Sequence, residues 1–393
     1  MTNNFDKIRP YNDDETVEAV KRMAESPAIN NISKFIDPNL DPKDLIKLLN
    51  TINGVNDFQE RVLSKIVQKV VDDTTEGLEV SGLENVSSDK CYLIISNHRD
   101  IILDSAFLQI ILLNDKQFTT EITVGDNLIS SPFVKDLMKS NKMVTVERGG
   151  TVKEKYFSSL NLSKYIRHSV STNTSSIWIS QRNGRTKDGY DTTEQGLLKM
   201  FEMSGSKDFV KDFTELSILP LSISYEYESC DFFKAKELYI SKSNKYVKSP
   251  NEDMQSMLTG IIQPKGKVHY SFGKPISIEE IKRCSLLDKN EKYLELASII
   301  DKRIRGNFTL VENNYIAADL LEKLKGLNDS KKILDELSSL EYKNNENYTI
   351  DKFTFFKNYM KNGLAKILEE NPTFNSKELA TIYLNIYANP LKY

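Results

Sequence analysis

The 393-residue chain is poor in the side chains that bind metals or form cross-links. It has three histidines and three cysteines, Cys91, Cys230 and Cys284. The cysteines are widely spaced and odd in number, so they indicate neither a zinc motif nor a disulfide framework, and reduced cytoplasmic thiols are expected. Since His168 and His269 lack neighbours at metal-ligand spacing, the sequence predicts no metal site.

The chain also lacks long hydrophobic segments. Residues 1–14 are polar and charged, without the apolar core of a secretory signal peptide. The most apolar stretch, residues 101–113, has ten apolar positions among thirteen, whereas a membrane span needs roughly 18 or more in succession. Asp104, Ser105 and Gln109 interrupt this stretch, and its length suits a buried helix. The sequence therefore predicts a cytoplasmic protein with no membrane-spanning helix.

Charge of one sign is not in excess either. The chain carries 53 basic and 56 acidic side chains, so the balance predicts no nucleic-acid partner. The basic residues are nevertheless uneven, because residues 135–187 contain eleven Lys and Arg against three Asp and Glu. A stretch of this kind suits a phosphorylated substrate, an anionic acyl donor or an anionic membrane surface.

Three regions differ in their pattern of apolar residues. Residues 1–82 and 286–393 have helical periodicity, while residues 83–285 alternate short apolar runs with helical segments. This alternation predicts an α/β fold, with a layered, mixed and largely parallel sheet and flanking helices, between helical N- and C-terminal regions. The expected strands are residues 91–96, 121–125, 143–147, 176–180, 217–225, 237–241 and 268–272.

The most informative stretch is residues 97–104 (NHRDIILD), directly after the first expected strand. A histidine at the mouth of a strand with an acid nearby can form a general-base pair. The acid then orients the imidazole and stabilises its cation. No serine or cysteine nucleophile is obvious beside His98, so we expect the attacking hydroxyl to belong to a substrate. The pattern predicts direct group transfer without a covalent enzyme intermediate.

This stretch resembles the first motif of the glycerolipid acyltransferases, a family of glycerol-3-phosphate and lysophosphatidate acyltransferases and their relatives. In that motif four residues separate Asn-His from Asp, whereas here five residues separate His98 from Asp104. Asp100 is therefore a second candidate partner. We favour Asp104, because Asp100 is suited to cap the helix that begins at Ile101. Asn97 is expected in the substrate site, where it shapes the loop around His98.

Three further segments follow in the family's order. Two of them are expected strands, one that ends at an arginine and one that contains a proline. Residues 144–150 (VTVERGG) resemble the second motif. This resemblance implies that Arg148, beside Gly149, meets the substrate phosphate, which a planar guanidinium can grip with two parallel bonds. Residues 218–225 (ILPLSISY) resemble the family's Val-Pro-Val motif, in which proline marks a strand start, edge or bulge.

Residues 177–189 (IWISQRNGRTKDG) resemble the third motif, a strand followed by Glu-Gly-Thr-Arg-Ser. The glutamate is missing, and Asn183 or Gln181 stands in its region. Glycine in this turn lets the backbone approach an anion closely. The residues expected to hold the substrate here are Arg182, Gly184, Arg185 and Lys187.

The resemblance implies an enzyme that moves a fatty acyl group from acyl-CoA or acyl carrier protein to a hydroxyl of glycerol-3-phosphate or lysophosphatidate. It places this enzyme in phospholipid synthesis, attached peripherally to the inner face of the membrane. No cofactor is expected, because a thioester is already activated. Three alternatives stay open: a thioesterase or lysolipid hydrolase, an amino-lipid O-acyltransferase, and a non-catalytic lipid-binding relative. The altered His-to-Asp spacing and the missing glutamate make the last of these plausible.

Overall fold

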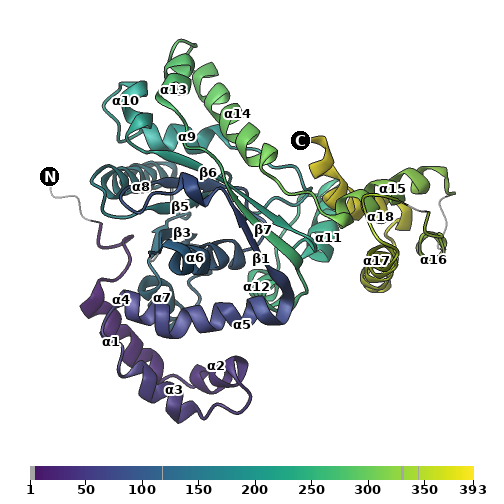
Figure 1. Cartoon of the computed structure of the whole chain (residues 1–393), viewed down its shortest axis with the longest axis horizontal. Helices are drawn as coiled ribbons and strands as arrows, with labels where there is room; N and C mark the ends of the chain where they lie inside the picture. Colours follow the sequence, from purple (N-terminus) through teal and green to yellow (C-terminus); the bar gives the residue numbers. More distant parts are fainter. Residues whose placement is uncertain (1–4, 117, 329–331, 344) are drawn as a thin grey trace.

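The computed structural model describes residues 5–116, 118–328, 332–343 and 345–393. In this part of the chain a single seven-stranded sheet lies between layers of helices (Figure 1). The strands lie in the order β1-β7-β6-β2-β5-β3-β4, and every neighbouring pair is parallel except β6 and β7. The predicted α/β fold with a mixed, largely parallel sheet is confirmed. The strands are β1 (Thr75–Ser81), β2 (Leu93–Ser96), β3 (Glu121–Gly125), β4 (Met143–Val146), β5 (Ile177–Ser180), β6 (Ile218–Tyr225) and β7 (Gly266–Phe272).

One predicted strand is wrong. Residues 237–241 end helix α11 (Asp231–Ser241). Their short run of apolar and aromatic residues between two polar ones (ELYIS) fits a strand. However, Leu238 and Tyr239 pack against helices near the C-terminus, and this tertiary contact overrides the local pattern.

One strand was not predicted. The side chains of β1 are exposed or half-buried at the edge of the sheet, and Gly77 within it has φ 113°. The sequence signal of this strand is therefore weak. β1 pairs with β7, so the sheet begins ahead of residue 83, inside the region expected to be helical.

Helices cover both faces of the sheet (Figure 1). Because side chains alternate along a strand, Leu93 and Ile95 of β2 face one helical layer and Ile94 faces the other. The first layer contains α8 (Val152–Ser171), α9 (Gln195–Glu202), α10 (Phe209–Thr214), α13 (Ile278–Ser285) and α14 (Glu291–Gly306). The second contains α5 (Ser64–Thr74) and α6 (Leu103–Lys116), with α12 (Glu252–Ile262) against α5 and α7 (Pro132–Ser140) against β4.

The N-terminal helices form a small bundle with a core of its own. Met23, Leu45 and Phe58 are buried in this core. An ion pair of Arg22 with Asp136, at 2.8 Å, joins the bundle to α7. Its elements are α1 (Asp13–Ala24), α2 (Ala28–Ile36), α3 (Pro42–Leu49), α4 (Val55–Phe58) and the π-helical turn η1 (Gln59–Leu63).

The helices after α14 form a second bundle that packs on α11. Phe356, Tyr383 and Tyr387 are buried at its centre. The predicted boundary between residues 285 and 286 falls between α13 and α14, although both helices pack on the same sheet face. The bundle consists of α15 (Glu312–Gly326), α16 (Ile333–Ser338), α17 (Ile350–Glu370), α18 (Ser376–Ala388) and η4 (Asn389–Lys392).

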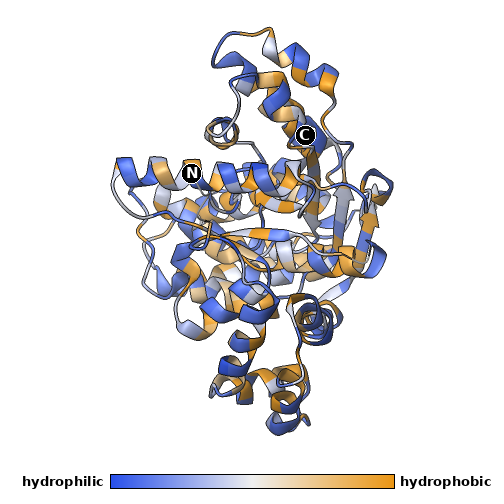
Figure 2. Ribbon diagram, turned by 90° about the vertical axis from the view of Figure 1, so that its left-hand side faces the viewer, coloured by the Kyte–Doolittle hydropathy of each residue, from blue (hydrophilic) through white to orange (hydrophobic). Residues whose placement is uncertain are grey.

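Hydrophobic and hydrophilic residues alternate along most helices, as expected where one helix face lies in a core (Figure 2). Among the described residues, no helix is both long and apolar enough to cross a bilayer. Two short 3-10 turns, η2 (Leu83–Asn85) and η3 (Asp126–Leu128), complete the fold, and η3 follows β3 directly.

Candidate active site

His98 lies in the short loop between β2 and α6, at the edge of the sheet where β2, β5 and β6 end. Its Nδ1 is 2.8 Å from Oδ2 of Asp104, which lies in the first turn of α6. The side chain is 14% exposed. Its ring packs against that of Trp178 in a T-shaped arrangement, with the ring centres 5.8 Å apart. Because the carboxylate occupies Nδ1, Nε2 is the ring nitrogen left for another partner.

Asp104 is completely buried and held from several directions. Its Oδ2 also accepts the backbone N–H of Arg99 at 2.6 Å and that of Asp100 at 3.0 Å. Its Oδ1 accepts the hydroxyl of Tyr225 at 2.9 Å. Burial raises the pKa of Tyr225 well above its ordinary value, so this hydroxyl keeps its proton and donates it to Asp104. The carboxylate is thus fixed in the position that orients the imidazole.

Asp100 caps α6 and does not contact His98. Its Oδ1 accepts the N–H groups of Ile102 and Leu103, both at 2.8 Å, and its Oδ2 accepts the hydroxyl of Ser229. The helix begins at Leu103, two residues later than expected. Of the two candidate acids, the structure brings Asp104 to the imidazole.

Asn97 connects the loop to two other segments. Its amide nitrogen donates to Oδ2 of Asp191 at 2.9 Å and to the carbonyl oxygen of Ile223 at 2.8 Å. Its Oδ1 accepts the N–H of Ile223 at 2.8 Å. Since the buried amide is engaged at both ends, Asn97 holds the loop in place and has no amide group left to contact a substrate.

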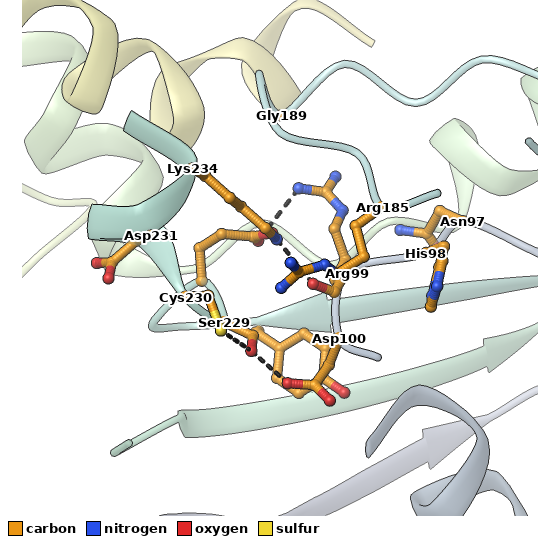
Figure 3. Close-up of polar contacts among 12 residues, drawn as sticks. Asn97, His98, Arg99, Asp100, Arg185, Gly189, Ser229, Cys230, Asp231 and Lys234 are labelled. Carbon is orange, nitrogen blue, oxygen red and sulfur yellow. Dashed lines mark hydrogen bonds and ion pairs between the residues drawn. The ribbon is translucent and has the colours of Figure 1, made fainter. Parts of the chain in front are cut away.

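Behind His98 lies a buried cluster of four charged side chains that the motifs did not predict. Figure 3 shows two of them, Arg99 and Lys234. Nη2 of Arg99 is 2.5 Å from Oδ2 of Asp191, and its Nη1 is 3.2 Å from Oε2 of Glu228. Nζ of Lys234 is 2.6 Å from Oε1 of Glu228 and donates to the carbonyl oxygen of Arg99 at 2.7 Å. Burial disfavours the charged guanidinium, but the two carboxylates outweigh it and hold the pKa of Arg99 well above its ordinary value. We call this group the Arg99 cluster.

The Arg99 cluster extends to the C-terminal bundle. Nη2 of Arg99 donates to the hydroxyl of Tyr393 at 3.2 Å. The same hydroxyl accepts the N–H of Asp191 at 3.1 Å and lies 2.7 Å from the carbonyl oxygen of Gly189, to which it donates. Gly189 has φ 76°, and a Cβ there would collide with the carbonyl oxygen of Ile386. The end of the chain thus clamps residues 189–191 against the His98 loop.

The segment that follows β5 carries the predicted cationic residues. The N–H of Thr186 donates to the carbonyl oxygen of His98 at 2.7 Å, which ties this segment to the His98 loop. Nη2 of Arg185 donates to the hydroxyl of Ser256 at 3.3 Å. Within the described residues, Nη1 of Arg185 and Nε of Arg182 are buried without a hydrogen-bond partner. These two guanidinium groups therefore retain donors for an anion.

The other predicted residues of this segment have different surroundings. Lys187 forms an ion pair with Glu237 of α11, so its charge is partly neutralised. Gly184 has φ 80°, a backbone conformation that favours glycine, and Asn183 beside it is exposed.

Arg148 follows β4 and is exposed. Its N–H donates to Oδ1 of Asp126 at 3.3 Å. Its guanidinium lies against Gly125, where a Cβ would collide with Nε. Gly149 is exposed beside it and is not among the residues that line the cavity described next.

A cavity of about 1170 Å³ opens at His98. Its wall is mainly apolar and draws on α2, α5, α6, α7 and α12, with side chains such as Phe35, Val67, Ile110, Leu137 and Ile261. The polar part of its lining includes Arg148, Arg182, Arg185 and Lys187. The structure thus combines a histidine–carboxylate pair, a long apolar space and a group of cationic side chains. Among the described residues no set of three or more His, Cys, Asp or Glu side chains is arranged to hold a metal ion.

Comparison with known proteins agrees with this arrangement. Residues 77–224 match the Acyltransferase family, and they include every predicted site residue. This part of the chain, which carries all four motifs, is therefore similar to the acyltransferase family that the motifs predicted. A search of curated proteins found no match. Among solved structures, the 1-acyl-sn-glycerophosphate (LPA) acyltransferase PlsC from Thermotoga maritima is similar, at 12% sequence identity and a TM-score of 0.35, over 75% of this chain and 95% of that one.

Proposed function

We propose that the protein transfers a fatty acyl group from a thioester donor, acyl-CoA or acyl carrier protein, to a hydroxyl of glycerol-3-phosphate or lysophosphatidate in phospholipid synthesis. One observation carries this proposal: the His98–Asp104 pair opens into an apolar cavity whose lining also holds arginines. The cavity can accommodate an acyl chain, and the arginines can accommodate a phosphate.

In the proposed reaction, Nε2 of His98 removes the proton from the acceptor hydroxyl. The oxygen then attacks the thioester carbonyl carbon, and the new C–O bond replaces the C–S bond. The departing thiolate takes the proton back from the imidazolium. Asp104, bound to Nδ1, stabilises the transient positive charge on the ring. The proposed chemistry needs no metal or redox cofactor, because the thioester supplies the activation.

Arg182 and Arg185 are the proposed partners of the acceptor phosphate. Each retains a buried nitrogen without a partner among the described residues, so a bound anion would satisfy them. Arg148 lines the same cavity and can add a third guanidinium. Lys187 is the weakest candidate, because Glu237 already neutralises it.

The test is to incubate the protein with radiolabelled acyl-CoA and either glycerol-3-phosphate or lysophosphatidate. We expect label in one acylated phosphate product, and the His98→Ala variant to lower kcat by about 10²–10⁴-fold. His168→Ala is the matched control, because that exposed histidine lies on α8 outside the cavity. Arg185→Ala should raise KM for the phosphorylated acceptor by about tenfold or more.

Other outcomes would redirect or end the assignment. Free fatty acid released without an acceptor would identify a hydrolase. Product formed only with an amino-lipid would change the acceptor. Full activity in His98→Ala would contradict the proposed base. Lipid binding with no turnover of either donor would identify a non-catalytic relative.

A further inference from the structure

The outer face of α12 carries apolar side chains that no part of the described chain covers. Met254, Leu258 and Ile262 lie four residues apart on this helix, and Val247 precedes it. These four side chains are between 50% and 79% exposed. Leu258 and Ile262 also line the cavity. The apolar surface of the cavity therefore continues onto the outside of the molecule at α12.

The inner face of α12 packs closely against residues of the site. This packing determines which side chains of the helix point outward. Sγ of Cys230 donates to the carbonyl oxygen of Ser256 at 3.2 Å. Gly260 lies so close to Asp100 that a Cβ there would collide with Oδ2. Because Ser256 and Gly260 face inward, Met254, Leu258 and Ile262 are left on the outer side of the helix.

A second exposed apolar group lies in the first turns of α8. Val152, Tyr156 and Phe157 are 55–87% exposed, and Ser159 in the next turn lines the cavity. Contacts through η3 join this group to α12. Nδ2 of Asn127 donates to Oδ2 of Asp253 at 3.3 Å, and the adjacent Asp126 accepts the N–H of Arg148. The two apolar groups are therefore connected along the edge of the cavity, and we call them the rim.

The rim also carries positive charge. Residues 147–157 and 242–262 contain six basic side chains against four acidic ones. Lys153, Lys155 and Lys245 make no ion pair with any described residue. Apolar and aromatic side chains interspersed with unpaired lysines suit a surface of anionic lipids, into which the side chains insert while the lysines meet the headgroups.

We propose that the rim docks the protein on the surface of an anionic bilayer, so that a lipid acyl chain can pass between the bilayer and the cavity along Leu258 and Ile262. The route to the cavity rests on the proposed function, whereas docking itself can be measured without turnover. A passage along apolar side chains spares the acyl chain exposure to water.

The test measures sedimentation of the full chain with vesicles of phosphatidylglycerol and phosphatidylcholine, and with vesicles of phosphatidylcholine alone. The informative variant is Val247→Glu with Met254→Glu, because neither residue lines the cavity. The matched control is Leu286→Glu with Leu294→Glu, two exposed leucines near the α13–α14 connection, in the helical layer opposite that of α12. We expect the rim variant to bind the mixed vesicles at least about tenfold more weakly than the natural chain, and the control to bind as the natural chain does.

Several results would overturn docking at the rim. The first is that the rim variant binds the mixed vesicles as tightly as the natural chain does. The second is that the control variant loses as much vesicle binding as the rim variant. The third is that the natural chain does not bind the mixed vesicles. Equal affinity for both vesicle types would overturn the preference for anionic lipid. If the rim variant lost turnover only with acyl carrier protein and kept vesicle binding, the rim would dock a protein and the proposal would be wrong.

The natural chain and the rim variant also distinguish a failure of this proposal from a failure of the proposed function. Turnover of glycerol-3-phosphate with soluble acyl-CoA should be unchanged in the rim variant. If the natural chain binds vesicles but acylates neither acceptor, the function fails and the docking stands. If it acylates glycerol-3-phosphate but binds no vesicles, the docking fails and the function stands.

Discussion

Oδ2 of Asp104 lies 2.8 Å from Nδ1 of His98, while Asp100, which is closer in the sequence, turns its carboxylate to the start of α6. Replacement of each acid by its amide distinguishes their roles. Asp104→Asn should lower kcat by about 10²–10⁴-fold, because an amide can stabilise neither the correct tautomer nor the imidazolium. The measurement is steady-state kinetics alongside thermal unfolding.

Asp100→Asn is the matched comparison. We expect it to destabilise the fold by about 1–2 kcal/mol through the loss of a charged helix cap, with a much smaller effect on kcat. A larger loss of kcat in Asp100→Asn than in Asp104→Asn would contradict the pairing on which the mechanism depends.

The hydroxyl of Tyr393 holds the segment that follows the proposed phosphate-binding arginines, Arg182 and Arg185. In Tyr393→Phe the N–H of Asp191 and the carbonyl oxygen of Gly189 lose a partner. Residues 186–191 should then be less well fixed. We expect KM for a phosphorylated acceptor to rise by about tenfold, the value of one buried hydrogen bond, with kcat nearly unchanged. Initial-rate kinetics at varied acceptor concentration would measure the effect.

Tyr190→Phe is the control for this variant. Its ring lies 5.9 Å from that of Tyr393, yet its hydroxyl makes no hydrogen bond with the described residues. Its kinetics should match those of the natural chain. An equal rise of KM in both variants would show that ring packing, and not the hydroxyl of Tyr393, positions the segment.

Asp231 makes the C-terminal bundle sensitive to pH. Burial raises its pKa to about 6, although hydrogen bonds from Tyr387 and Tyr383 oppose the shift. Between pH ~4 and ~6 the folded state therefore holds a proton that the unfolded state has lost, so ionisation of Asp231 lowers stability as pH rises through this window. The contribution is about 2–3 kcal/mol.

Urea denaturation of the natural chain and of Asp231→Asn measures this contribution. The stability of the natural chain relative to the variant should fall by that amount from pH ~4 to ~7, because the amide does not ionise. A constant difference across the range would show that the carboxylate is already ionised in the fold at low pH.

Gly260 makes the close approach of α12 to the site possible. Gly260→Ala should destabilise the fold by about 1–3 kcal/mol, because its methyl group meets Oδ2 of Asp100, which Ser229 holds in place. In α9 the matched change Gly196→Ala meets no atom within 4 Å and should stabilise by about 0.5–1 kcal/mol. Thermal unfolding of both variants checks the pair. A stable Gly260→Ala would mean that α12 can move outward.

Much of the site could be predicted because its residues follow strands directly. β2, β5 and β6 are almost wholly buried, so their apolar runs are easily recognised, and His98 and Arg182 come within two residues of a strand end. The edge strand β1 shows how exposure removes that signal, since its polar side chains and Gly77 leave no apolar run to recognise.

The Arg99 cluster could not be predicted for a different reason. Arg99 stands next to His98 in the sequence, but its partners Asp191, Glu228 and Tyr393 come from three distant segments. A single sequence shows which charges exist and not which of them are buried together. Only the packing of the C-terminal bundle on α11 brings Tyr393 to the site, and no local pattern encodes that contact.

The contact between Arg99 and Tyr393 spans 294 positions of the chain. A ribosome synthesises residue 99 long before residue 393, so in a nascent chain Arg99 can meet Asp191 and Glu228 while it still lacks the hydroxyl of Tyr393. The growing chain therefore lacks one contact of the site until residue 393 is made. Translation that stops short of residue 393 would leave residues 189–191 without the hydroxyl that holds them.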